Sequence, residues 1–232
     1  MLFGIVVFPG SNCDRDCQVA IESVLKEKTV FIWHQEKTLP SVDLLILPGG
    51  FSYGDYLRTG AIASHSPIMK AVIAYANAGG KVLGICNGFQ ILTESGLLPG
   101  ALLRNRKLKF ICKNVSIRVD NRDTFLTSSI KDREVLTLPI AHAEGNYYVE
   151  PAVLSTMKRK NQIVFSYCDA NGVVADDANP NGSIDSIAGI CNEAGNVLGM
   201  MPHPERVTDP LLGVTDGVRL FQSLQSIKDK VI

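Results

Sequence analysis

The sequence carries no excess of charge of either sign. Among its 232 residues, 23 lysines and arginines balance 23 aspartates and glutamates, so the formal net charge at pH 7 is zero. Proteins that bind nucleic acid normally present a basic face to phosphate, so this balance argues against nucleic acid as a partner. The charged fraction of 20% is too low for a disordered chain, and 46% hydrophobic residues are enough for a sizeable core.

Long apolar runs are also missing. No stretch approaches the ~20 residues that a membrane helix needs, and the apolar start at 1–8 has no basic flank. The cysteines are spaced irregularly, unlike a disulfide framework, and Cys13 and Cys17 lack the further ligands of a zinc site, which favours packing roles. The cysteines are Cys13, Cys17, Cys86, Cys112, Cys168 and Cys191. We therefore expect a cytoplasmic protein with reduced thiols and no membrane association.

The first hundred residues predict a parallel α/β arrangement. Short apolar runs that are typical of buried strands alternate with helix-like stretches that end at glycine. The expected strands are 2–8, 29–33, 43–47 and 81–85, and the expected helices are one capped by Ser11 or Asn12, 67–78 and 88–95. Strand and helix alternating at this spacing indicate a sheet covered on both faces.

Beyond residue 100 the pattern becomes that of antiparallel strands. Residues 115–119 alternate polar and apolar, and a final amphipathic helix is expected at 216–227. Turn signals separate the short apolar runs between them; these are Asn171-Gly172, Asn181-Gly182 and 192–196. No repeat or linker divides the chain. We expect one α/β domain over residues 1–232, with a mostly parallel central sheet, flanking helices and an antiparallel section in its C-terminal half.

The strand at 81–85 leads into Gly84-Ile85-Cys86-Asn87-Gly88, a nucleophile elbow with cysteine in place of serine. Glycines two residues before and after the nucleophile relieve crowding at a tight strand-to-helix turn. The positive end of the helix dipole also stabilises a thiolate at this position. Cys86 is therefore the candidate nucleophile, and the alternative interpretation is a buried structural cysteine.

A cysteine nucleophile needs a base and a group that orients the base. Only four histidines are present, and His203 lies between two prolines, which favour an extended backbone. Residues two apart in an extended segment face the same side, so Glu205 is expected beside His203, where a carboxylate stabilises the imidazolium. The alternative is a rigid proline-rich turn with both side chains in solvent.

Acyl transfer also needs donors for the developing oxyanion. The loop 48–51 follows an expected strand, so its amides belong to the same carboxyl edge of the sheet as the elbow. The backbone N–H groups of Gly50 and Asn87 are the candidate donors. A glycine pair after a strand also fits an ordinary turn.

Three motifs in this order, the Pro48-Gly49-Gly50 loop, the elbow continued by Phe89-Gln90, and His203-Pro204-Glu205, resemble those of class I (triad) glutamine amidotransferases. Further stretches resemble the branch of that family whose members are glutaminase subunits in purine biosynthesis. These stretches are 9–14, 50–56, 179–183, 200–206 and 213–217. The resemblance spans nearly the whole chain and implies a flavodoxin-like α/β fold.

The resemblance implies a glutaminase reaction. Cys86 attacks the side-chain amide of L-glutamine, and His203, oriented by Glu205, moves protons while a glutamyl thioester forms and is hydrolysed. Candidate residues for holding the substrate are Gln90, Phe51 and His142. For His142 a purely structural role fits the sequence equally well. The resemblance implies no metal or organic cofactor in this reaction.

The resemblance also implies partners. No P-loop pattern occurs, and free ammonia is lost in water, so the ammonia is expected to pass to another subunit. The family implies a large synthetase subunit, which holds ATP and magnesium and converts formylglycinamide ribonucleotide to formylglycinamidine ribonucleotide, and a small bridging subunit. A basic cluster fits either a solvated loop or a docking surface for the synthetase. Its members are Arg104, Arg106, Lys107 and Lys109.

Two other functions are compatible with the same residues. A cysteine hydrolase or peptidase of a related elbow-bearing α/β fold would cleave esters or peptides and ignore glutamine. A non-enzymatic binding module would use its glycine-rich loops only to hold a ligand. The spacing of His203 and Glu205 and the Gly49-Gly50 loop favour the glutaminase, and labelling of Cys86 by a glutamine-like diazo-ketone would exclude the binding module.

Overall fold

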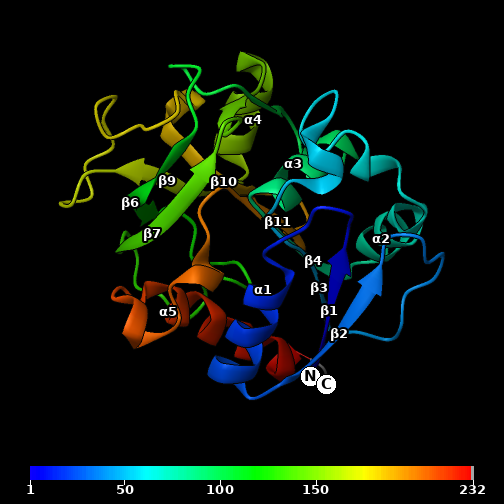
Figure 1. Ribbon diagram of the computed structural model, residues 1–232. Helices are drawn as coiled ribbons and strands as arrows, with labels where there is room; N and C mark the ends of the chain where they lie inside the picture. Colours follow the sequence, from blue (N-terminus) through cyan, green and yellow to red (C-terminus); the bar gives the residue numbers. More distant parts are fainter. Residues whose placement is uncertain (231–232) are drawn as a thin grey trace.

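A computed structural model describes residues 1–230 of the chain (Figure 1). Its strands are β1 (Leu2–Val7), β2 (Lys28–Trp33), β3 (Leu44–Leu47), β4 (Lys81–Ile85), β5 (Ala101–Leu103), β6 (Ile111–Val119), β7 (Val135–His142), β8 (Asn146–Tyr148), β9 (Ile163–Cys168), β10 (Ile187–Cys191) and β11 (Val197–Met200). Its α-helices are α1 (Asp14–Ala20), α2 (Pro67–Asn77), α3 (Asn87–Glu94), α4 (Pro151–Arg159) and α5 (Asp216–Ser223).

A nine-stranded sheet runs through the molecule in the order β2-β1-β3-β4-β11-β10-β9-β6-β7. The strands from β2 to β11 in this order are parallel, and from β10 onward each strand is antiparallel to its neighbours. The expected change from parallel to antiparallel strands is therefore confirmed. The last strand, β11, returns to the middle of the sheet and lies beside β4, with Met200 opposite Ile85. A separate two-stranded sheet pairs β5 with β8.

Helices cover both faces of this sheet (Figure 1). The unit β1-α1-β2 and the unit β3-α2-β4 move in opposite directions along the strand order. Because such crossovers are right-handed, α1 and α2 lie on opposite faces. On its own face α1 continues as the π-helical turn Ile21–Leu25, which packs on α5, while α3 packs on β3, β4 and β11.

The central strands are hydrophobic along their whole length because both of their faces are covered. All four residues of β3 have no exposed surface. The edge strand β2, in contrast, alternates in exposure at its end, with Ile32 buried and Trp33 exposed. Within the described residues no helix has both the length and the apolar character that crossing a bilayer requires.

Several expected boundaries were wrong. Cys13, rather than Ser11 or Asn12, precedes α1, and no side chain caps that helix. The last α-helix ends at Ser223 and continues as 3₁₀ turns over Leu224–Lys230, so only part of 216–227 is α-helical. Of the three turn signals, only 192–196 joins antiparallel neighbours, β10 and β11. The other two lie in the long connection between β9 and β10.

The sequence patterns did not predict β7 or α4. A proline at position 139 interrupts β7, and a proline inside an apolar run normally argues against a strand. The strand forms nevertheless because it lies at the edge of the sheet and pairs only with β6. This strand also contributes to the site. The N–H of His203 donates to the carbonyl oxygen of Pro139, and the sulfur of Cys86 lies near the carbonyl oxygen of Ala141.

Candidate active site

Three loops meet at the carboxyl edge of the parallel sheet. They follow β3, β4 and β11, which are direct neighbours. The carboxyl ends of adjacent parallel strands open into one crevice, which is where α/β proteins bind ligands. The sheet therefore brings together the glycine loop after Leu47, the elbow after Ile85 and the histidine segment after Met200, although these lie far apart in the sequence.

The elbow has the strained geometry that its glycines suggest. Cys86 has φ +50° and ψ −104°, an unfavourable conformation for a residue with a side chain, and it immediately precedes α3. A Cβ atom on Gly88 would lie 1.9 Å from the carbonyl oxygen of Leu47, and one on Gly84 would lie 2.7 Å from the carbonyl of Gly88. The glycines therefore let the turn pack against β3. Cys86 is 4% exposed, and its sulfur lies 3.8 Å from the Ala141 carbonyl oxygen.

The glycine loop is held by the first loop of the chain. Gly50 has φ +139°, and a Cβ there would lie 2.7 Å from the backbone nitrogen of Asn12. The N–H groups of Phe51 and Tyr53 donate to the carbonyl oxygens of Gly10 and Pro9, at 3.0 and 2.6 Å. These bonds orient the loop. Asn87 begins α3, where helix geometry leaves its N–H without an acceptor inside the helix.

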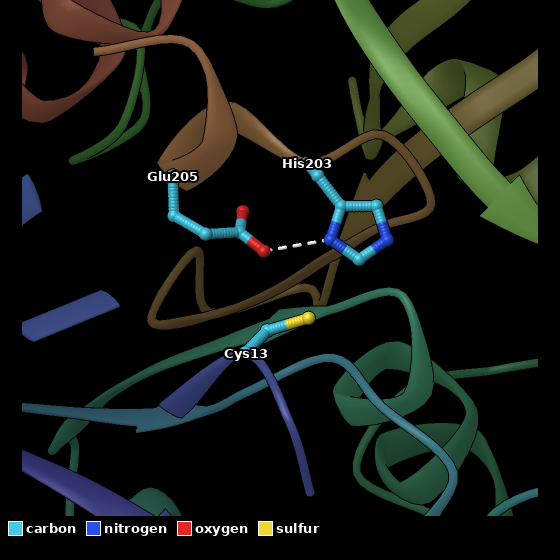
Figure 2. Close-up of side chains that lie close together, drawn as sticks. All are labelled: Cys13, His203 and Glu205. Carbon is cyan, nitrogen blue, oxygen red and sulfur yellow. Dashed lines mark hydrogen bonds and ion pairs between the residues drawn. The ribbon is translucent and has the colours of Figure 1, made fainter. Parts of the chain in front are cut away.

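His203 and Glu205 form a buried hydrogen-bonded pair (Figure 2). The imidazole Nδ1 lies 2.6 Å from Oε1 of Glu205, and the residues are 2% and 3% exposed. Burial lowers the pKa of His203, but the charges of Glu205 and Cys86 outweigh this effect and raise that pKa well above its ordinary value. A 3₁₀ turn, Pro204–Arg206, brings the two side chains together, not the fully extended segment expected from the prolines.

Two adjoining cavities lie beside these groups. The first, of about 130 Å³, is lined by Gly50, Phe51, Asp55, Thr59, Cys86, Gln90 and residues 141–144. The second, of about 230 Å³, is lined by His203 and shares Gly50, Phe51 and Ala141 with the first. Phe51, which lines both cavities, stacks on Phe110 with ring centroids 6.4 Å apart, and both rings are partly exposed. A cavity of this size fits a small molecule rather than a polypeptide.

Most of the residues expected at the site meet here. Gly50, Phe51, Cys86, Gln90 and His142 line the first cavity. His203 lines the second, and Glu205 and Asn87 lie buried behind the lining residues.

The side chains of Asn87 and Gln90 already hold neighbouring segments. Asn87 accepts from the N–H of Ser52 at 3.2 Å and donates to Gln90 at 2.9 Å. Gln90 in turn donates to the carbonyl oxygen of Glu144 at 2.5 Å. This chain of hydrogen bonds ties the glycine loop, the elbow helix and the segment after β7 into one wall of the cavity.

His142 is 3% exposed and lies in the first cavity. Its Nδ1 lies 3.1 Å from Oδ1 of Asn105, an oxygen that also accepts from the N–H of Gly145. Because that oxygen can only accept, Nδ1 carries the proton and Nε2 is a bare acceptor. Nε2 has no partner. Burial, and then the charge of His203, lower the pKa of His142 to about 4, so the ring is neutral at pH 7.

The sequence patterns missed the role of Cys13. Its sulfur, a ring nitrogen of His203 and a carboxylate oxygen of Glu205 lie within 4.8 Å of one another (Figure 2). Such a trio resembles a metal site, but the guanidinium of Arg206 donates to the same sulfur at 3.0 Å. Its positive charge opposes a second cation there. Cys13 therefore belongs to the hydrogen-bonded surroundings of the histidine and does more than pack.

The sequence patterns also missed three polar residues of the first cavity. Asp55, Thr59 and Glu144 line it, and none of the residues that line this cavity is a lysine or an arginine. Asp55 lies inside a stretch that carried the family resemblance and Glu144 lies two residues after His142, but their positions gave no sign that both line one cavity. Burial, and then the charge of Glu144, raise the pKa of Asp55 from its ordinary value to about 6.

The fold and this site define a glutamine amidotransferase. The chain belongs to the CobB/CobQ-like glutamine amidotransferase family, whose domain profile matches residues 3–226. It is similar to the phosphoribosylformylglycinamidine synthase subunit PurQ of Synechocystis sp. (strain ATCC 27184 / PCC 6803 / Kazusa), with 58% identity over 221 residues, covering 95% of this chain and 99% of that protein. The corresponding subunit of Koribacter versatilis (strain Ellin345) is 57% identical over 224 residues, covering 97% of each chain.

A solved structure shows the same fold. A chain in the structure of PurLQS from Thermotoga maritima has a TM-score of 0.86 and 44% sequence identity to this protein, with 97% of each chain covered. The expected membership of the class I amidotransferases and the expected α/β fold are therefore confirmed.

Proposed function

We propose that this chain is the glutaminase subunit of a phosphoribosylformylglycinamidine synthase and that residues 1–232 form one amidotransferase domain. The observation that carries the proposal is the arrangement of Cys86: a strained strand-to-helix turn presents it to a small cavity that adjoins His203 and its buried partner Glu205. The similarity to the PurQ subunits over nearly the full length supports the same conclusion.

The reaction proceeds by acyl transfer to sulfur. The Cys86 thiolate adds to the amide carbon of the glutamine side chain, and the N–H groups of Gly50 and Asn87 donate to the oxyanion. His203 gives a proton to the leaving nitrogen, so that the C–N bond breaks and ammonia departs. His203 then takes a proton from water as the water attacks the thioester, which releases glutamate and the thiol. Glu205 stabilises the imidazolium throughout.

Other residues of the cavity position the substrate. Gln90 holds the Glu144 segment and lines the pocket, Phe51 lines it from the glycine loop, and His142 offers a neutral acceptor. None of these steps calls on a metal or an organic cofactor in this subunit. The free thiols of the chain suit the reducing conditions of the cytoplasm, where we place the protein.

The ammonia serves a partner. We propose that a large synthetase subunit uses it, with ATP and magnesium, to convert formylglycinamide ribonucleotide to formylglycinamidine ribonucleotide in purine biosynthesis, and that a small bridging subunit completes the complex. The names of the similar PurQ proteins and of the Thermotoga maritima complex support this assignment. The rival function, a peptidase, suits a cavity of about 130 Å³ poorly, because a polypeptide substrate needs a longer groove.

Replacement of Cys86 by alanine tests the proposal. In the assembled complex we expect Cys86→Ala to abolish glutamine-dependent formation of the amidine while synthesis from added ammonium salt continues, because only the nucleophile is lost. Glutaminase assays with and without the synthetase also show whether docking activates the site. The matched control is Cys168→Ala, a buried cysteine at the end of β9 away from both cavities. Loss of both activities from an intact complex would refute the ammonia-donor role.

A further inference from the structure

The turn that carries Glu205 is held only weakly by its own backbone. It spans Pro204–Arg206, and its two backbone hydrogen bonds, donated by the N–H groups of Arg206 and Val207, are long at 3.4 and 3.3 Å. Glu205 must nevertheless stay in place, since its carboxylate is hydrogen-bonded to the imidazole of His203. Contacts from outside the turn are therefore needed to fix it.

The side chain of Arg206 ties this turn to the start of α1. Its Nη2 donates to Sγ of Cys13 at 3.0 Å, and its Nε lies 3.6 Å from Oδ2 of Asp16. Cys13 immediately precedes α1, and Asp16 lies in the first turn of that helix. The planar guanidinium reaches both partners because its N–H groups have a fixed fork geometry, which the single ammonium group of a lysine does not reproduce. Cys13 is 1% exposed, so its sulfur is shielded from solvent.

Cys13 in turn lies against the imidazole of His203. In Figure 2 its sulfur points toward the ring, and this sulfur, a ring nitrogen and a carboxylate oxygen of Glu205 lie within 4.8 Å of one another. A Cβ atom on Gly49 would lie 2.6 Å from Cε1 of His203 and 3.3 Å from the sulfur of Cys13. The ring, the sulfur and the glycine loop therefore pack closely, and a displacement of the sulfur would give the ring room to turn.

We propose that Arg206 is a positioning residue for the catalytic pair. Its hydrogen bond to Cys13, which we call the clamp, joins the turn to the start of α1 and keeps the imidazole of His203 aimed at the nucleophile. The proposal rests on the glutaminase function above. Neither Arg206 nor Cys13 lines the cavity that contains the nucleophile, so both act through the histidine. The clamp also connects two stretches of the family resemblance, 9–14 and 200–206.

The test is the steady-state kinetics of the assembled complex with glutamine. We expect Arg206→Lys, which keeps the charge but loses the fork, to lower kcat about 10- to 100-fold with little change in KM, the range for a small misplacement of a reacting group. Cys13→Ala should have the same effect, and Cys13→Ser, which retains an acceptor for the guanidinium, should recover most of the activity. Arg15→Lys, at an exposed arginine of α1, is the control and should change neither constant.

A double variant distinguishes one shared hydrogen bond from two separate roles. If Arg206 and Cys13 act through the clamp, Arg206→Lys combined with Cys13→Ala loses no more activity than the worse single variant. Multiplication of the two losses would overturn the clamp. So would an unchanged kcat in Arg206→Lys, which indicates that only the charge matters, or a rise in KM alone, which indicates contact with glutamine.

A second measurement follows the ring without turnover. In NMR spectra of the full chain with ¹³C-labelled histidine, we expect one sharp Cε1 signal for His203 in the wild type and a broadened or split signal in both Arg206→Lys and Cys13→Ala. An unchanged signal in both variants contradicts the clamp. If the wild-type complex does not hydrolyse glutamine, the proposed function fails, and the NMR spectra still decide whether Arg206 positions the ring.

Discussion

At the scale of single residues, the site depends on charges and donors kept away from water. His203 and Glu205 are both buried, and their hydrogen bond satisfies one nitrogen of the ring and one carboxylate oxygen. The remaining atoms, Nε2 of His203 and Oε2 of Glu205, have no partner among the described residues. Such unsatisfied buried atoms are unfavourable for stability, which is typical of groups kept for catalysis.

Removing the Glu205 charge should alter the pH dependence of the reaction. Because this carboxylate raises the pKa of His203, Glu205→Gln lowers that pKa. The imidazolium then loses its proton at a lower pH, so the alkaline limb of the kcat/KM profile shifts toward lower pH. We also expect kcat/KM to fall roughly 10²- to 10⁴-fold.

A pH-rate profile of the complex measures both effects. Glu205→Asp, which retains the charge, is the matched variant and should keep the alkaline limb closer to that of the wild type. An alkaline limb that does not move in Glu205→Gln would contradict the role of the carboxylate.

At the scale of elements, the elbow shows how local sequence and tertiary packing act together. The strand β4 and the helix α3 follow from their apolar patterns. The turn between them, however, brings α3 so close to β3 that position 88 has no room for a side chain. The glycines at positions 84 and 88 thus satisfy a contact between elements rather than a local turn preference.

A methyl group at position 88 should therefore be costly. In Gly88→Ala the new Cβ meets the Leu47 carbonyl oxygen at 1.9 Å, and we expect a loss of about 1–3 kcal/mol in the free energy of unfolding. The displaced elbow should also reduce glutaminase activity. Gly96→Ala, at the other end of α3, is the control: its φ is +73° but no atom lies within 4 Å, so only about 1 kcal/mol should be lost. Urea unfolding of both variants measures the difference, and equal stabilities would contradict the packing argument.

At the scale of the whole molecule, the basic cluster lies next to the mouth of the site. Arg104 reaches Glu144 at the cavity wall, and Phe110, which follows Lys109, lines the second cavity. Arg106 pairs with Asp176, whereas Lys107 and Lys109 are exposed and form no ion pair among the described residues. This position beside the site favours the docking interpretation of the cluster over a solvated loop.

Reversing the charge of the two lysines that form no ion pair among the described residues tests this interpretation. Lys107→Glu combined with Lys109→Glu should weaken association with the synthetase on the order of tenfold, chiefly by slowing association, and more at low salt. Surface plasmon resonance at two salt concentrations measures this effect. The double variant Lys26→Glu/Lys28→Glu, at exposed lysines near α1, is the control. An unchanged association rate would show that the loop is only solvated.

The local sequence determined much of this protein. Cys86 between its glycines, His203 with Glu205, and the Gly49-Gly50 loop could each be predicted because a tight turn, a proline-flanked segment or a strand end needs particular residues nearby in the chain. The parallel strands β1 to β4 were predictable for the same reason, since each is a short apolar run between clear stops.

Only the tertiary structure decided how distant segments meet. The return of β11 beside β4, the position of Cys13 next to His203, and the presence of Asp55 and Glu144 in one cavity depend on strand order and on the closure of long loops. These contacts join residues separated by tens to nearly two hundred positions. They form because the folded chain buries the whole sheet. A local pattern of apolar and polar residues does not determine which strands become neighbours in that sheet.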